Sequence, residues 1–194
     1  MLRLREGTAA SYVLHVDPEG VLPPEPRDEG GTALPPSLRE QLRPMAVEIV
    51  GSATTARAQA EALESFFRDG FLYSLEADLS GTEHPLVVLV RERRPAYCAY
   101  FASAMAALLR SLDVPARVVG GFAPGEVNRL TGRVLVRDRD AHAWVEAWLP
   151  EEGRYVAFDP TPWRSRDATT GIERGRGWLA SATEALTMAA RRGW

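Results

Sequence analysis

The chain has 194 residues, of which 45% are hydrophobic and 25% charged, and its formal net charge is −3 at pH 7. These proportions are typical of a soluble globular protein with one domain and extensions. The negative charge argues against nucleic-acid binding, the three histidines are too scattered for a metal cluster, and no apolar run approaches the roughly 20 residues of a membrane span. We therefore expect no nucleic-acid partner, no metal and no membrane span in this chain.

A proline-rich stretch comes first. Seven of the 14 prolines lie between residues 17 and 44, after a short predicted strand over residues 11–16. Proline lacks a backbone N–H and fixes φ, so it fits neither a central strand nor the interior of a helix. We expect residues 1–44 to form an extended arm, and the folded domain to begin at residue 45. The N-terminus has no continuous apolar core, so a secretory signal is not expected.

The following segments predict helices. In residues 54–70, apolar side chains recur with a helical period between a capping threonine and Gly70, which ends the helix. Residues 84–94 show the same period after Pro85, and a short extended piece is expected between these two helices. A third helix begins near Cys98 and must end before Pro115.

Beyond Pro115 the apolar period changes from 3.6 to 2. Residues 116–122 and 132–136 are typical of strands, residues 141–149 alternate between two faces, and a turn leads to a returning strand over residues 154–159. Helices followed by adjacent strands predict an α+β domain with a mainly antiparallel sheet over residues 45–163. We expect residues 164–194 to be a tail with an amphipathic helix at its end.

Cys98 is the only cysteine, so an internal disulfide is excluded. Its position at the start of a helix favours a thiolate, because free N–H groups and the positive end of the helix dipole lie there. A free cysteine is also among the most buried residue types and packs as a small hydrophobe. The position of Cys98 alone leaves open whether it is a nucleophile or a core residue.

A cysteine nucleophile needs a base and a third group that orients the base. His15 lies in the arm and His84 beside Pro85, which leaves His142 on the alternating strand. If Leu149 pairs with Arg154 across the turn, the numbers of opposed residues sum to 303. Asp159 then lies diagonally across from His142 on the same face of the sheet, within side-chain reach. An aspartate before a proline is also an ordinary turn residue.

Three blocks of the sequence resemble the transglutaminase-like domain, a branch of the papain-like cysteine enzymes. They are YCAYFASAMAALLRSLDVPARVVGGF, RDAHAWVEAWL and FDPTPW. The resemblance covers residues 45–163 and is greatest to a bacterial group whose domain lies outside the cytoplasmic membrane between transmembrane helices. It implies that Cys98 is the nucleophile, His142 the base and Asp159 the group that orients it.

Three positions depart from the family pattern. The family usually has glycine two residues before the cysteine and an acidic or amide residue just after it, where this chain has Ala96 and Ala99. Ala96 would impair activity if that position needs a positive φ or close approach of the substrate. Asp113 stands where the family often has glycine, and aspartate tolerates the left-handed end of a helix.

The resemblance implies acyl transfer without a cofactor, on a protein or peptide substrate and through a thioester at Cys98. We expect peptide or glutamine-type amides as substrates, with hydrolysis slightly favoured over transamidation, and Tyr97 and Trp144 along the substrate cleft. The alternative is an impaired domain of the same fold that only binds. If the chain is excised from a membrane-anchored protein, it belongs at the extracytoplasmic face of the membrane, and otherwise in the cytoplasm.

Overall fold

The computed structural model describes residues 31–165 except 124–125, 128–129, 132–133 and 138–139. The strand expected over residues 11–16 and the helix expected near the C-terminus lie outside these residues. The described chain begins with four helices: α1 (Pro36–Val50), α2 (Ala56–Gly70), α3 (Pro85–Glu92) and α4 (Cys98–Ser111). α2, α3 and α4 agree with the sequence-based expectation, and Thr55 caps α2 by accepting the N–H of Ala58.

Helix α1 corrects the expected extended arm. It begins at Pro36 and contains Pro44, so the boundary expected after residue 44 falls inside a helix. Pro36 lacks a backbone N–H, which costs nothing in the first helical turn because N–H groups there have no acceptor within the helix. The rest of the helix is stabilised by a buried stripe that recurs every four residues, and this stripe outweighs the proline in its interior. The stripe consists of Leu38, Leu42, Ala46 and Val50.

The main sheet has three antiparallel strands in the order β1–β4–β5. They are β1 (Ala116–Phe122), β4 (Ala141–Leu149) and β5 (Arg154–Phe158), and a separate two-residue pair joins β2 (Glu126–Val127) to β3 (Val134–Leu135). Val145 pairs with Phe158 and Leu149 with Arg154, which is the predicted register. The α+β class with a mainly antiparallel sheet is therefore confirmed.

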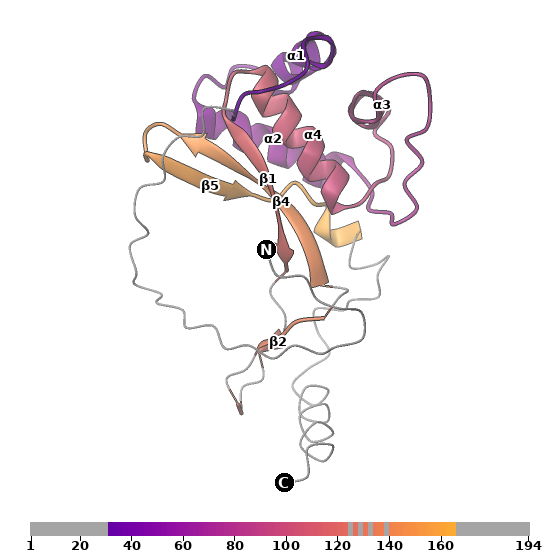
Figure 1. Cartoon of the computed structure of the whole chain (residues 1–194), viewed down its shortest axis with the longest axis vertical. Coiled ribbons are helices and arrows are strands. Elements are labelled where there is room, and N and C mark those ends of the chain that lie inside the picture. Colours follow the sequence, from indigo (N-terminus) through magenta and orange to yellow (C-terminus); the bar gives the residue numbers. More distant parts are fainter. Residues whose placement is uncertain (1–30, 124–125, 128–129, 132–133, 138–139, 166–194) are drawn as a thin grey trace.

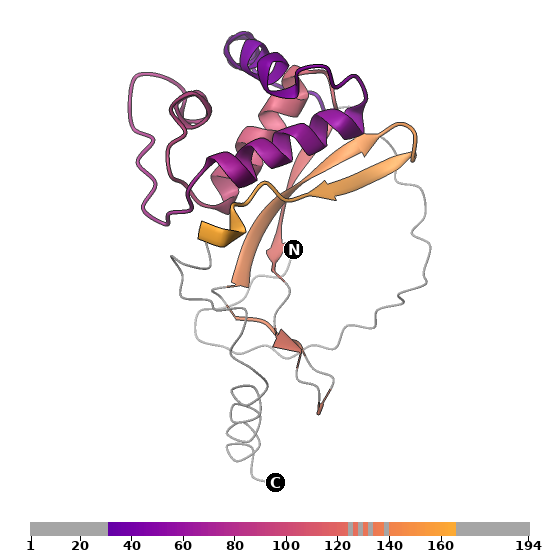
Figure 2. The ribbon, with the colours of Figure 1, turned by 180° about the vertical axis from the view of Figure 1, so that it is seen from behind.

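Helices α1, α2 and α4 lie together on one side of this sheet (Figures 1 and 2). α4 is the central helix, because it packs on β4 and contacts each of the other helices. The two layers meet in a core in which bulky side chains of α4 face small and branched side chains of β4. These residues are fully buried: Phe101, Met105, Leu108, Leu109, Val145, Ala147 and Leu149.

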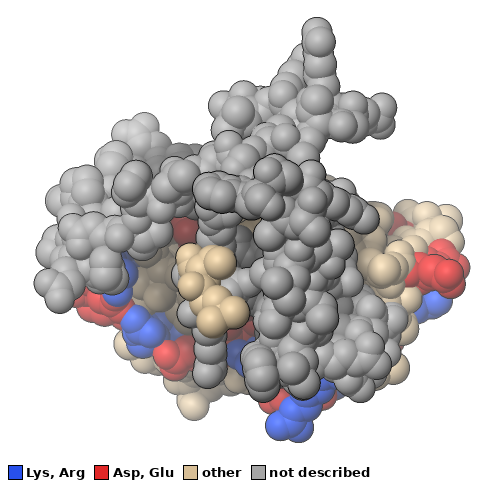
Figure 3. Space-filling model, turned by 90° about the horizontal axis from the view of Figure 1, so that it is seen from below, with Lys and Arg blue, Asp and Glu red and all other residues tan. Residues whose placement is uncertain are grey.

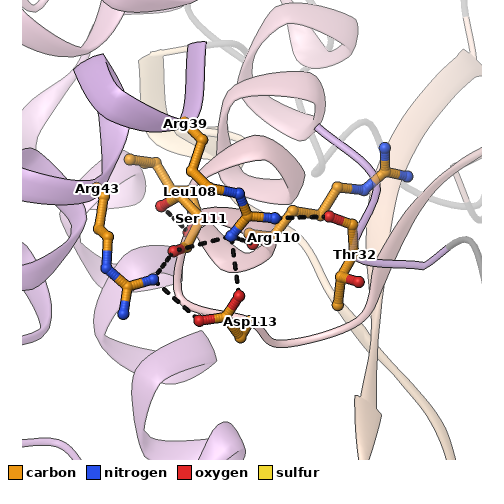
Figure 4. Close-up of polar contacts among 7 residues, drawn as sticks. All are labelled: Thr32, Arg39, Arg43, Leu108, Arg110, Ser111 and Asp113. Carbon is orange, nitrogen blue, oxygen red and sulfur yellow. Dashed lines mark hydrogen bonds and ion pairs between the residues drawn. The ribbon is translucent and has the colours of Figure 1, made fainter. Parts of the chain in front are cut away.

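Two arginines of α1 hold the C-terminal end of α4 (Figure 4). Arg39 donates to the carbonyl of Arg110 at 2.8 Å and to Asp113 at 2.9 Å, and Arg43 contacts the Ser111 carbonyl and Asp113. The last carbonyls of a helix have no partner within the helix and lie at the negative end of its dipole, so cations are favourable there. Asp113 has φ 65°, the left-handed conformation expected for this position.

None of the described helices is long and apolar enough to cross a membrane. Within the same residues, no group of three or more His, Cys, Asp or Glu side chains is arranged to hold a metal ion. On the face shown in Figure 3, basic and acidic side chains of the described residues lie next to one another rather than in a patch of one sign.

Candidate active site

Cys98 is the first residue of α4, as the sequence predicts. The backbone just before it forms a parallel bridge with the segment that follows α2. The Ala96 N–H donates to Leu72 at 3.3 Å, and the Ser74 N–H donates to Ala96 at 2.8 Å. These bonds fix the point at which α4 begins, and they leave the Cys98 side chain partly exposed.

Ala96 is accommodated without backbone strain. It is fully buried, and it is not among the non-glycine residues with positive φ, which in the described part of the chain are Arg93 and Asp113. A glycine is therefore not required at this position for its conformation. Ala99 is half-buried, and its backbone N–H interacts with the Cys98 sulfur.

His142 lies near the start of β4, opposite Gly121 of β1. Its Nε2 is 3.0 Å from Oδ2 of Asp159, so the register brings together the two residues that the sequence placed on one face. His142 is only 8% exposed, and its Nδ1 is buried without a hydrogen-bond partner among the described residues. One ring nitrogen is thus held by a carboxylate, and the other keeps its hydrogen-bonding capacity unused.

Asp159 follows β5 and has several hydrogen-bond partners besides His142. Its Oδ1 accepts the N–H of Thr161 at 3.1 Å, and its Oδ2 accepts the indole N–H of Trp163 at 2.8 Å. Its own backbone N–H donates to Glu64 of α2 at 2.7 Å. The carboxylate orientation is therefore fixed from within the chain.

Trp163 and Glu64 belong to the site but were not predicted as site residues from the sequence. Trp163 belongs to the FDPTPW block, so a signal for it was present. Glu64 lies on α2 beside the buried Leu63 and four residues after the buried Ala60. A carboxylate next to the apolar side of a helix is the signal that could have drawn attention to it.

The ionisation of Cys98 and His142 is coupled. Burial raises the pKa of the Cys98 thiol, but His142 and the Ala143 backbone N–H outweigh burial, so the pKa is lowered. Burial lowers the pKa of His142, but Asp159 and Cys98 outweigh it and raise that pKa to about 9. The two side chains therefore lie close together, although no hydrogen bond of ordinary geometry joins Nδ1 to the sulfur.

Burial acts on Asp159 in the same sense as on the thiol. It raises the pKa of the Asp159 carboxyl, but His142 and Thr161 outweigh it and the net pKa is lowered. These shifts favour a state in which Asp159 is a carboxylate, His142 an imidazolium and Cys98 a thiolate. Such a set can take a proton from sulfur and return it to a leaving group.

The two residues expected along the cleft lie on different elements. Tyr97 precedes α4, is partly buried, and packs its ring edge-on to Tyr100 with 4.9 Å between centroids. The Trp144 ring lies 6.2 Å from the His142 ring, and it also covers Gly121. A Cβ on Gly121 would lie only 2.7 Å from the Trp144 indole. Any side chain at this position would therefore push the indole from its place beside His142.

A family model described as "Transglutaminase-like superfamily" matches residues 43–160. The chain belongs to this superfamily. The match contains Cys98, His142 and Asp159, and it begins inside α1, which agrees with α1 as part of the folded domain.

Individual relatives agree with this assignment. A protein-glutamine gamma-glutamyltransferase of Pseudomonas aeruginosa is 38% identical over 123 residues, which are 61% of this chain and 18% of that protein. The uncharacterized protein YebA of Bacillus subtilis is 33% identical over 135 residues, which are 66% of this chain and 18% of YebA. The chain therefore spans about a fifth of the length of these two relatives.

Two solved structures have a fold similar to that of this chain. The crystal structure of the periplasmic domain of TgpA from Pseudomonas aeruginosa has a TM-score of 0.60 and 33% sequence identity to this chain. The matched region covers 71% of this chain and 47% of that structure's chain. A second crystal structure of that domain, bound to ethylmercury, matches with a TM-score of 0.59 and 34% identity.

Proposed function

We propose that the protein is an acyl-transfer enzyme in which Cys98 is the nucleophile, His142 the general base and Asp159 the residue that orients His142. The observation that carries this proposal is the environment of the His142 ring. Its Nε2 lies 3.0 Å from Asp159. Its buried Nδ1 has no hydrogen-bond partner among the described residues, and the nearby Cys98 thiol has a lowered pKa. This is the arrangement that cysteine nucleophiles require.

The reaction follows from these positions. His142 takes the thiol proton at Nδ1, and the Cys98 thiolate attacks the carbonyl carbon of an amide. The tetrahedral adduct collapses as the imidazolium protonates the nitrogen, which leaves as ammonia or an amine, and a thioester remains on Cys98. His142 then deprotonates water or an amine, which attacks the thioester and regenerates the thiol. Asp159 stabilises the imidazolium in both halves of the reaction.

We propose a glutamine-type side-chain amide of a protein or peptide as the acyl donor. The support is the 38% identity to a protein named protein-glutamine gamma-glutamyltransferase. Water is the default acceptor because it is always present, so hydrolysis is the expected reaction in the absence of an amine. An amine at sufficient concentration diverts the same thioester to transamidation.

We propose that the domain works outside the cytoplasmic membrane as part of a longer, membrane-anchored protein. The similar TgpA structure is described as a periplasmic domain, and the matched residues are only 18% of the curated relatives. We also propose that the domain extends from about residue 36 to about residue 163. These boundaries correspond to the start of α1 and to the end of the Asp159 network.

The test is a paired product assay on one sample. The protein is incubated with a glutamine-containing peptide and a labelled primary amine, and both ammonia release and label incorporation are followed. Ammonia without label means hydrolysis, and ammonia with label means transamidation. Neither product from a panel of peptides would contradict the proposal and favour the binding domain that Ala96 and Ala99 suggest. Cys98→Ala is the matched control and should give neither product.

A further inference from the structure

We propose that Trp163 is a positioning residue for the His142–Asp159 pair, and that Glu64 holds the backbone side of the same aspartate. The inference rests on the proposed role of Cys98 and adds two residues to the site. Trp163 would act through its hydrogen bond to Asp159 and its ring contact with His142, and Glu64 through the Asp159 backbone.

Oδ2 of Asp159 has two hydrogen-bond partners among the described residues. This oxygen lies 3.0 Å from Nε2 of His142 and 2.8 Å from Nε1 of Trp163. An indole nitrogen can only donate, so Oδ2 serves it as an acceptor and points where Trp163 holds it. In the neutral ring, Nε2 of His142 must then carry the proton. The Nδ1 lone pair is left to accept the thiol proton, which gives the imidazolium.

Aromatic side chains also border the His142 ring. The rings of Trp163 and His142 lie 4.8 Å apart at an angle of 50°. With the Trp144 ring 6.2 Å away, two indoles border an imidazole that is only 8% exposed. Excluding water lowers the local dielectric constant, which strengthens the His142–Asp159 hydrogen bond.

Trp163 is itself held in place by hydrogen bonds of its own turn. Its backbone N–H donates to the Thr161 carbonyl at 2.8 Å. Two residues later, the Ser165 hydroxyl accepts the N–H of Tyr73 at 2.9 Å and donates to the Pro162 carbonyl at 3.0 Å. Tyr73 also forms the bridge with Ala96 just before Cys98. The turn that bears Trp163 is therefore tied to the segment that positions the cysteine, and Figures 1 and 2 show this turn beside one end of α4.

Glu64 completes the arrangement from α2. Its Oε1 accepts the Asp159 N–H at 2.7 Å, and its side chain is 22% exposed. The same oxygen lies 3.8 Å from a guanidinium nitrogen of Arg68. Asp159 is thus held at its backbone by a helix 95 residues earlier in the chain and at its carboxylate by the turn that follows it. Loss of either contact should let the carboxylate move away from His142.

The experiment measures alkylation of Cys98 by iodoacetamide as a function of pH, which needs no substrate. Trp163→Phe keeps an aromatic ring but removes the N–H donor. We expect the acid limb of its profile, where the alkylation rate rises with pH, to shift to higher pH. The alkylation rate near pH 6 should then fall on the order of tenfold, the effect of one pKa unit. Trp148→Phe is the matched control, because Trp148 packs on Tyr155 with 5.3 Å between centroids, and its profile should equal that of the wild type.

The direction of the shift tests positioning against simple electrostatics. A carboxylate with one donor fewer is a stronger partner for imidazolium, so electrostatics alone would move the acid limb to lower pH. An unchanged limb, or a shift to lower pH, overturns the proposal for Trp163. The thermal unfolding midpoint is measured on the same samples, so that a loss of folding is recognised.

Glu64 supplies a second pair of variants should Trp163→Phe fail to fold. Glu64→Gln keeps an oxygen that accepts the Asp159 N–H and should retain the wild-type profile, whereas Glu64→Ala should show the upward shift. Equal profiles for the two variants overturn the role of Glu64. An ordinary thiol profile in the wild type overturns the proposed function as well. A depressed wild-type profile that Trp163→Phe shifts upward, without turnover of any peptide, supports the positioning and counts against acyl transfer.

Discussion

At Cys98 two opposing effects decide the ionisation of the thiol. Burial raises the thiol pKa, and His142 together with the backbone N–H groups of Ala143 and Ala99 lowers it by more. Replacement of His142 by alanine should therefore raise the pKa of alkylation to the free-thiol value of about 8.5 or above it, while the wild type stays below that value. The measurement is the alkylation rate between about pH 5 and about pH 10. Coincident profiles would mean that Cys98 is an ordinary core cysteine.

The ionisation of His142 also links stability to pH. Its folded-state pKa is raised to about 9, above the unfolded value of about 6.5. The stabilisation from the charged imidazole is therefore fully present below about pH 6.5 and is lost as the pH rises through about 9. His142→Ala should remove this part of the alkaline destabilisation, which urea unfolding at several pH values would detect.

Asp159→Asn is predicted to lower turnover on the order of a thousandfold or more, with little change in the unfolding midpoint. An amide in place of the carboxylate no longer stabilises the imidazolium, and its NH₂ group favours the wrong tautomer of His142. The side chain keeps one oxygen for the Thr161 N–H, so the turn should survive. A purified variant with most of the wild-type activity would make Asp159 a turn residue alone.

Gly121 and Gly120 form a matched pair for the position of Trp144. A Cβ on Gly121 would lie 2.7 Å from the Trp144 indole, whereas nothing lies within 4 Å of a Cβ on Gly120. Gly121→Ala should destabilise the fold by about 1–3 kcal/mol through overpacking, and Gly120→Ala should be neutral. Urea unfolding measures the difference. Equal stability of the two variants would show that the indole moves aside at no cost.

At the scale of elements, the contact between α1 and the end of α4 depends on Asp113. Asp113→Ala loses the ion pairs to Arg39 and Arg43 and leaves a Cβ residue without polar support at φ 65°. Asp113→Gly loses the same pairs but tolerates that φ. Because the Asp113 side chain is 66% exposed, the pairs contribute at most about 1 kcal/mol. We expect the alanine variant to be less stable than the glycine variant by about 1–2 kcal/mol in urea unfolding. Equal losses would refute the conformational part of this account.

The sequence predicts the elements that follow local rules. Strict alternation over residues 141–149 and a short turn set the register that pairs Leu149 with Arg154, and this register places Asp159 beside His142. The extended arm expected through residue 44 was wrong over residues 36–44, because the prolines there were weighted above an apolar stripe with a four-residue spacing. That stripe was visible in the sequence and corresponds to the buried face of α1.

Contacts between distant segments were not predictable in the same way. Glu64 reaches the Asp159 backbone across 95 residues, and no periodicity in either segment indicates that contact. Ala96 was expected to put activity in doubt, but its conformation depends on a bridge to Tyr73 that only the folded chain shows. The residue types of the site follow from local pattern and resemblance, whereas the contacts that hold them follow from tertiary structure.

At the scale of the whole molecule, the composition makes the protein a poor substrate for itself. All 23 basic residues are arginine, so the chain has no lysine, and its glutamines are Gln41 and Gln59. Both lie on helices and donate their amide N–H to backbone carbonyls. We predict that the purified protein forms no covalent ladders even with transamidase activity, as judged by denaturing gel electrophoresis and mass spectrometry. Isopeptide-linked oligomers would contradict this, because no side-chain amine is available to form them.

Cys98 should carry the acyl group during turnover, and intact-protein mass spectrometry detects such an adduct. The protein is mixed with excess glutamine peptide, quenched in acid during turnover, and digested to locate any adduct. We expect a mass increase equal to the acyl part of the peptide, located on Cys98 and absent in Cys98→Ala. Neutral hydroxylamine should release the adduct, because it cleaves thioesters. Product formation at an undiminished rate by Cys98→Ala, or turnover with the acyl group on another residue, would contradict this role of Cys98.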